Sequence, residues 1–224
     1  MSLDSTVSGT IDHKGQRDFH TFSLTEGTRV LFDTLTYRSD LRWTLTGPKG
    51  TIVSARTMYG SDADWISGNT ALNLKAGNYT LYLDGVNEAT GDYAFRLATF
   101  ASATAINYDT AQTGTLSPGN ETQLFRFNGT AGDTLNFDWD QAIAGDDARW
   151  RLFDPYGELI FGPLNASSVD QNGVLLKLDG EYTLSIEGPP YVSSDTSYSF
   201  TVNFVENVTI PPLEGVAFTL GDFI

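Results

Sequence analysis

The chain has no cysteine, only two histidines and few basic residues among its 224 residues. The lack of cysteine excludes disulfide bonds, thiolate catalysis and cysteine-ligated zinc sites. The 13 Lys and Arg residues stand against 28 Asp and Glu residues, which gives a net charge of −15. Nucleic acid and anionic membranes are therefore unfavourable partners, because both are bound through Lys and Arg contacts to phosphate.

Long apolar runs are also missing. No segment approaches the roughly 20 apolar residues that cross a bilayer, so we expect no membrane insertion. No long segment has the 3.6-residue periodicity of an amphipathic helix either. Met1-Ser2-Leu3 leads directly into polar sequence, and we expect the chain to be part of a longer protein.

Short alternating segments fill the chain instead. In Phe125-Arg126-Phe127-Asn128 and Tyr79-Thr80-Leu81-Tyr82-Leu83, every second residue is apolar and points to one face, which is typical of a strand with one buried face. Gly47-Pro48-Lys49-Gly50 and Asp154-Pro155-Tyr156-Gly157 predict turns, because Pro presets φ and Gly accepts positive φ. We therefore predict an all-β fold of antiparallel strands in two-sheet, jelly-roll-like sandwiches.

The strongest signal is an internal repeat. Placing Gly9 over Gly114 aligns similar residues in the same order along both halves of the chain. The aligned pairs are Phe22 with Phe127, Phe32 with Phe137, Trp43 with Trp150, Gly77 with Gly180, and Tyr93 with Tyr198. The repeat predicts two tandem β-sandwich domains, each with its own core around one of the two aligned tryptophans.

The repeat also predicts the domain boundaries. Residues 1–100 form the first copy, residues 101–206 form the second, and Ala101 to Asn107 act as a short linker. Residues 207–224 are expected to be a linker and the start of a truncated third copy, since Leu220-Gly221-Asp222-Phe223-Ile224 resembles the opening of the first. The expected neighbours of this chain are then further repeats of the same protein.

Several segments of both copies also carry a family resemblance. They are Glu26-Gly27-Thr28, Ala76-Gly77-Asn78-Tyr79-Thr80-Leu81 and Gly91-Asp92-Tyr93-Ala94-Phe95, then Ala131-Gly132-Asp133, Gly180-Glu181-Tyr182-Thr183-Leu184 and Ser197-Tyr198-Ser199-Phe200. With the two Pro-containing turns, residues 4–205 resemble two copies of the bacterial pre-peptidase C-terminal (PPC) domain. The resemblance implies a jelly-roll-like sandwich, accessory to secreted enzymes or repeated in surface proteins, and relatives that bind calcium, matrix or polysaccharide. No peptidase domain is visible in this chain.

Catalytic groups are scarce. His20 aligns with Phe125 and is expected to pack inward, whereas His13 lies in a predicted turn. The sequence has no nucleophile-elbow, zinc-protease or phosphate-loop motif. A pair of carboxylates for sugar hydrolysis would leave no local motif, but we favour a non-catalytic protein.

Acidic residues concentrate in the second half of the chain. Residues 1–105 hold nine basic and 11 acidic residues, whereas residues 106–224 hold four and 17. The densest group is Asp138, Asp140, Asp146 and Asp147, and calcium prefers six to eight oxygen ligands of this kind. These four residues are the candidate calcium site, and a solvated acidic loop is the alternative.

Four aromatic residues have no counterpart in the other copy and are expected in loops: Tyr59, Trp65, Trp139 and Tyr191. Such residues cap the end of a sandwich, or they stack on the apolar faces of sugar rings. The sequence therefore favours a stalk, spacer or adhesion repeat of a large secreted or cell-surface bacterial protein. The alternative is an accessory module that binds polysaccharide or extracellular matrix beside a secreted protease or glycosidase.

Overall fold

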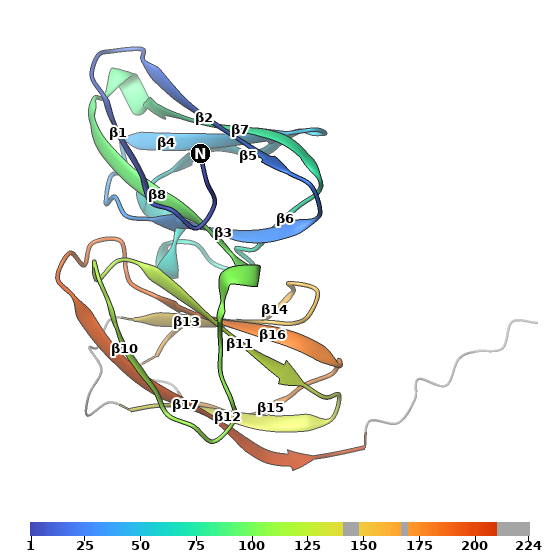
Figure 1. Ribbon diagram of the computed structural model, residues 1–224. Coiled ribbons are helices and arrows are strands. Elements are labelled where there is room, and N and C mark those ends of the chain that lie inside the picture. Colours follow the sequence, from blue (N-terminus) through green and yellow to red (C-terminus); the bar gives the residue numbers. More distant parts are fainter. Residues whose placement is uncertain (141–147, 167–169, 210–224) are drawn as a thin grey trace, which may run out of the picture.

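The computed structural model describes residues 1–140, 148–166 and 170–209. Within them the chain consists of β-strands joined by turns and four short 3-10 helices (Figure 1). The prediction of an all-β sandwich fold is confirmed. Across these described residues, no helix has the length and apolar character needed to cross a membrane.

Residues 7–99, the first lobe, form two antiparallel four-stranded sheets in the order β1-β8-β3-β6 and β2-β7-β4-β5. This is the strand order of a jelly roll. The strands are β1 (Val7–Ile11), β2 (Arg17–Leu24), β3 (Thr28–Thr34), β4 (Leu41–Gly47), β5 (Gly50–Thr57), β6 (Leu72–Leu74), β7 (Gly77–Gly85) and β8 (Gly91–Thr99).

Residues 104–207, the second lobe, form sheets in the order β10-β17-β12-β15 and β14-β13-β16-β11-β9. Sheet β10-β17-β12-β15 corresponds to β1-β8-β3-β6, and strands β14-β13-β16-β11 correspond to β5-β4-β7-β2. Strand β9 is added in parallel at the edge beside β11. The strands are β10 (Gln112–Leu116), β11 (Thr122–Gly129), β12 (Asp133–Trp139), β13 (Arg149–Phe153), β14 (Leu159–Asn165), β15 (Gln171–Leu175), β16 (Gly180–Glu187), β17 (Thr196–Asn207) and β9 (Thr104–Ala105).

The two lobes share their register as well as their strand order. Phe22 of β2 pairs with Tyr79 of β7, and Phe127 of β11 pairs with Tyr182 of β16. In both pairs the two rings are stacked, with centroids 5.0 Å and 5.7 Å apart. The aligned sequence landmarks therefore occupy the same structural positions.

Two glycines of the repeat are required by close packing. Gly9 pairs with Tyr93, and Gly114 pairs with Tyr198. A Cβ atom at Gly9 would lie 2.3 Å from the Tyr93 hydroxyl oxygen, and one at Gly114 would lie 2.2 Å from that of Tyr198. Each phenol crosses its glycine and donates a hydrogen bond beyond it, Tyr93 to Asp18 and Tyr198 to Gln123.

Each lobe has its own hydrophobic core. Trp43 and Trp150 are both fully buried and lie in separate core clusters, as the repeat predicted. The expectation that Trp139 lies in a loop is wrong: it is the last residue of β12, it is 5% exposed, and its ring meets Trp150 edge-on. It has no aromatic counterpart because Thr34 takes the equivalent position at the end of β3.

The lobes stack so that the chain forms four sheet layers (Figure 1). The outward faces of sheet β1-β8-β3-β6 and sheet β14-β13-β16-β11-β9 cover each other. A third apolar cluster fills this interface, contributed by Leu31, Ala98, Phe100, Ala103, Leu124 and Phe153. Because both outward faces are buried, the interface extends the protein interior across the two lobes.

The segment expected to be a linker is structured. The 3-10 helix η4 (Phe100–Ser102) places Phe100 between the lobes, and β9 follows it at the edge of the second lobe. At the other end, Asn207 still belongs to β17, and residues 210–224 with the proposed third copy lie outside the described residues. The division into domains at residues 100 and 206 stays a prediction, because a shared strand order does not show that each lobe folds alone.

Candidate functional site

The proposed calcium ligands are only partly described. Asp138 lies in β12, is half-buried, and accepts a hydrogen bond from Asn203 at 2.6 Å. Asp140 is exposed directly after this strand, whereas Asp146 and Asp147 lie outside the described residues. The described part of the chain contains no group of three His, Cys, Asp or Glu side chains placed to hold a metal ion. The calcium site stays a prediction.

The two histidines lie in different surroundings, one packed among aromatic rings and the other exposed in a turn. His20 packs edge-on against Tyr93 and Phe95, as Phe125 does against Tyr198 and Phe200 in the other lobe. Burial lowers the pKa of the His20 imidazole below its ordinary value. His13 is exposed in the turn between β1 and β2, where its backbone N–H contacts Gln16.

An exposed aromatic cluster lies at the junction of the lobes. Its members are Tyr37, Tyr59, Trp65 and Tyr191. Tyr37 follows β3, Tyr59 and Trp65 belong to the 3-10 helices η1 (Tyr59–Ser61) and η2 (Ala63–Trp65), and Tyr191 comes from the loop before β17. The ring centroid of Tyr37 lies 6.0 Å from those of Tyr59 and Tyr191 and 6.5 Å from that of Trp65.

The aromatic cluster is not a core. Tyr37, Trp65 and Tyr191 expose 52%, 43% and 44% of their surface, although they contact one another. Contiguous exposed apolar surface of this kind marks a binding surface more often than scattered exposed residues do. Of the four aromatic residues expected in loops, Trp139 alone is a core residue and the other three belong to this cluster.

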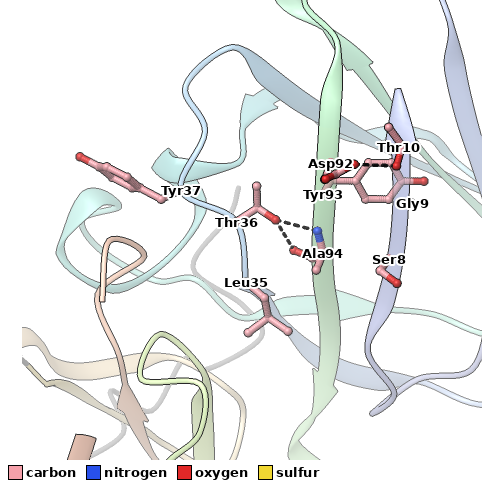
Figure 2. Close-up of a pocket in the computed structure, with 9 residues that line it drawn as sticks. All are labelled: Ser8, Gly9, Thr10, Leu35, Thr36, Tyr37, Asp92, Tyr93 and Ala94. Atoms are coloured by element: carbon pink, nitrogen blue, oxygen red, sulfur yellow. Dashed lines mark hydrogen bonds between the residues drawn. The ribbon is translucent and has the colours of Figure 1, made fainter. Parts of the chain in front are cut away.

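A groove of about 650 Å³ adjoins the cluster and shares Tyr37 with it. Its other walls are β1, β8 and the segment after β3 (Figure 2). Thr10 and Asp92 contribute polar groups and are joined by a 2.7 Å hydrogen bond from the Thr10 hydroxyl. The side chain of Tyr37 projects away from the strands, so it extends the surface beyond the groove (Figure 2).

A buried ion pair holds the loop that carries Trp65. The Arg151 guanidinium of β13 pairs with Glu187 of β16, and both side chains are almost completely buried. From the second lobe, Arg151 also donates to the backbone carbonyls of Ala63 and Ile66 in the first. This one guanidinium therefore fixes the position of η2 on both sides of Trp65.

Two buried carboxylates complete the interface. Asp62 accepts hydrogen bonds from the backbone N–H groups of Ala63 and Thr34. Asp33 accepts from the Thr122 N–H and forms a salt bridge with Arg96 at 2.6 Å. Asp33, Asp62 and Glu187 thus place three acidic groups in one buried region. The guanidinium groups of Arg96 and Arg151 lie in the same region.

Burial shifts the protonation of these carboxylates. It raises the pKa of Asp33 to about 6, although Arg96 opposes the shift. Burial, with the charges of Asp33 and Glu187, raises the pKa of Asp62 well above its ordinary value. The native state therefore binds protons more readily than the unfolded chain, and its stability increases as the pH falls through the folded pKa toward the unfolded one.

We predict that the wild type gains stability relative to Asp33→Asn when the pH falls from 7 to 5. The expected gain is about 1–2 kcal/mol, because the variant lacks the carboxylate whose pKa is raised. Urea unfolding of both proteins at each pH measures it. Asp40→Asn is the control. Arg38 lowers the pKa of the Asp40 carboxyl, so the stability difference between the wild type and Asp40→Asn should stay constant between pH 7 and 5. A constant difference between wild type and Asp33→Asn would contradict the prediction.

The comparisons with known proteins assign no family to the chain. No protein-family model and no curated protein matches it. A solved structure of a periplasmic inhibitor of g-type lysozyme from Aeromonas hydrophila is 15% identical, with 46% of this chain and 96% of that one covered and a TM-score of 0.35. The CUB1-EGF-CUB2 structures of human MASP-1/3 and rat MASP-1 are 9% and 7% identical. They cover 87% and 90% of this chain, 99% and 98% of their own, with TM-scores of 0.26 and 0.28.

Proposed function

We propose that the chain is a non-catalytic module of a larger secreted or surface-exposed bacterial protein, in which its two lobes act as a stiff spacer or adhesion repeat. We further propose that it belongs with the PPC-like domains that its sequence resembles. One observation carries the spacer role, namely the buried interface between the lobes. A flexible string of domains would keep the facing sheet surfaces polar and hydrated.

The interface combines apolar and polar contacts. Phe100 and Phe153 pack with their ring centroids 5.2 Å apart in the interlobe cluster. Arg151 crosses the interface in one direction, and Arg96 crosses it in the other with a bond to the Thr122 carbonyl. Apolar packing and buried ion pairs at the same surface restrict the angle between the lobes, as a spacer requires.

Small-angle X-ray scattering tests this role. The scattering of the wild type should fit a single arrangement of the lobes, at low and at high salt. Phe100→Ala should loosen the interface, because it removes a ring that contacts both lobes, and its curve should require a range of interlobe angles. Phe19→Ala is the control, since Phe19 is an aromatic residue of β2 that is 61% exposed and lies away from the interface. A wild-type curve that itself requires many angles would contradict the spacer role.

The alternative is a module that binds polysaccharide or extracellular matrix. The aromatic cluster favours polysaccharide, because exposed rings next to hydroxyl and carboxylate groups suit a ligand with apolar ring faces and polar edges. Calcium at the acidic residues of the second lobe remains a separate proposal.

A further inference from the structure

We propose that the aromatic cluster and the adjoining groove together bind an uncharged polysaccharide chain. This inference rests on the second of the two proposed functions and assigns it a site. The site contains residues of both lobes, since Tyr37, Tyr59 and Trp65 belong to the first and Tyr191 to the second. It is complete only when the lobes are packed as they are in this structure.

The chemistry of the two parts is complementary. Tyrosine and tryptophan present an apolar ring face together with a hydroxyl or N–H group at one edge. A pyranose has an apolar face of C–H groups and a rim of hydroxyl groups, so it matches such rings by stacking. In the groove, Asp92 is an exposed acceptor, and Ser8 and Thr10 carry hydroxyl groups close by. A ligand rich in hydroxyl groups uses both kinds of contact.

Other ligands fit the surface less well. A cation held by aromatic rings needs a free centre between them, but here the rings pack on one another: Tyr37 contacts the other three, and the centroids of Tyr59 and Trp65 are 4.9 Å apart. Nucleic acid and anionic polysaccharides are repelled by a chain of net charge −15. The electrostatics therefore favour an uncharged chain of sugars over an anionic one.

The site is held in place before any ligand binds. The Tyr59 N–H donates to the carbonyl of Arg38, next to Tyr37, at 3.1 Å. The Trp65 N–H donates to the Asp62 carbonyl at 3.2 Å, while Arg151 holds the carbonyls on either side of it. A surface that is already ordered loses less conformational entropy on binding, which favours affinity.

Affinity electrophoresis with soluble neutral polysaccharides tests the site. The probes are hydroxyethyl cellulose, galactomannan, arabinoxylan and dextran, each included in a native gel. At least one should retard the wild type. Tyr37→Ala and Trp65→Ala should each weaken this retardation roughly tenfold or more, as the loss of a central contact residue does at other interfaces. Tyr156→Ala is the matched control, because Tyr156 is 68% exposed on a turn of the second lobe, outside the site, and should bind like the wild type.

Tryptophan fluorescence provides a second measurement on the unmodified protein. Trp65 is the exposed tryptophan, whereas Trp43, Trp139 and Trp150 are buried. Oligosaccharides of the retarding polysaccharide should change the emission of the wild type and leave that of Trp65→Ala unchanged.

The possible failures are distinguishable. Retardation that persists in Tyr37→Ala and Trp65→Ala would overturn this site while leaving polysaccharide binding to the module intact. Absence of retardation by all four probes would overturn both the site and the polysaccharide-binding function. Sedimentation showing that the wild type self-associates, and that Trp65→Ala does not, would assign the cluster to a second copy of the chain and would also overturn the proposal.

Discussion

Replacing Arg151 with methionine is expected to lower the free energy of unfolding by about 3–5 kcal/mol, because it leaves a buried carboxylate without its partner. The Glu187 side chain is only 1% exposed, so water cannot solvate its unpaired charge. The carbonyls of Ala63 and Ile66 would lose their donor as well. Urea unfolding followed by tryptophan fluorescence and circular dichroism measures the loss.

Two further variants identify its cause. Lys14→Met removes an ion pair with Glu88 whose side chains are 77% and 63% exposed, and should have little effect because solvent screens such pairs. Adding Glu187→Gln to Arg151→Met should restore part of the lost stability, since it removes the unpaired charge. If Arg151→Met unfolds like the wild type, the buried ion pair and the bonds of Arg151 to the first lobe contribute nothing measurable to the stability.

The repeat made most of the fold predictable. Alternation assigned inward positions to Phe22, Phe127, Trp43 and Trp150, and all four are buried in the cores of their lobes. The prediction succeeded because the burial of these residues depends on contacts within one sandwich. The sequence pattern of that sandwich occurs twice in the chain, so each copy supports the assignment made in the other. His20 followed in the same way from its alignment with Phe125.

The interface could not be predicted by the same rule. Alternation in β13 places Trp150 inward, and so places Arg151 on the outward face. On a single sandwich that face would meet water, but here the other lobe covers it and Arg151 is completely buried. Asp33 is buried for the same reason on the outward face of β3. The burial of both residues depends on how one lobe packs against the other, so no sequence pattern within one copy predicts it.

The aromatic cluster was predicted only in part. Tyr59, Trp65 and Tyr191 were recognised as unmatched aromatic residues, but Tyr37 was missed, although it contacts all three. Tyr59 and Trp65 lie between β5 and β6 in residues 58–71, a segment much longer than residues 166–170 between β14 and β15, whereas Tyr37 lies outside it, between β3 and β4. An insertion in one copy of a repeat is a reasonable place to look for a function that the other copy lacks.

The aligned tryptophans give the second large effect. Trp43→Ala and Trp150→Ala are each expected to lower the free energy of unfolding by about 3–5 kcal/mol, because each leaves a large cavity in a packed core. Both side chains are completely buried, and Trp43 stacks on Phe32 with ring centroids 3.9 Å apart. Urea unfolding measures both variants, and Trp65→Ala is the control with an exposed ring.

Replacement by phenylalanine should separate the two sites. The Trp43 indole N–H donates to the Ser61 hydroxyl at 2.7 Å, whereas the Trp150 indole N–H has no partner among the described residues. Trp43→Phe therefore loses a buried hydrogen bond, while Trp150→Phe removes an unpaired polar group whose burial is unfavourable. We expect the loss of stability to be greater for Trp43→Phe by about 1 kcal/mol. Equal losses would show that core packing alone determines the stability at both positions, and that the hydrogen bond to Ser61 contributes nothing measurable.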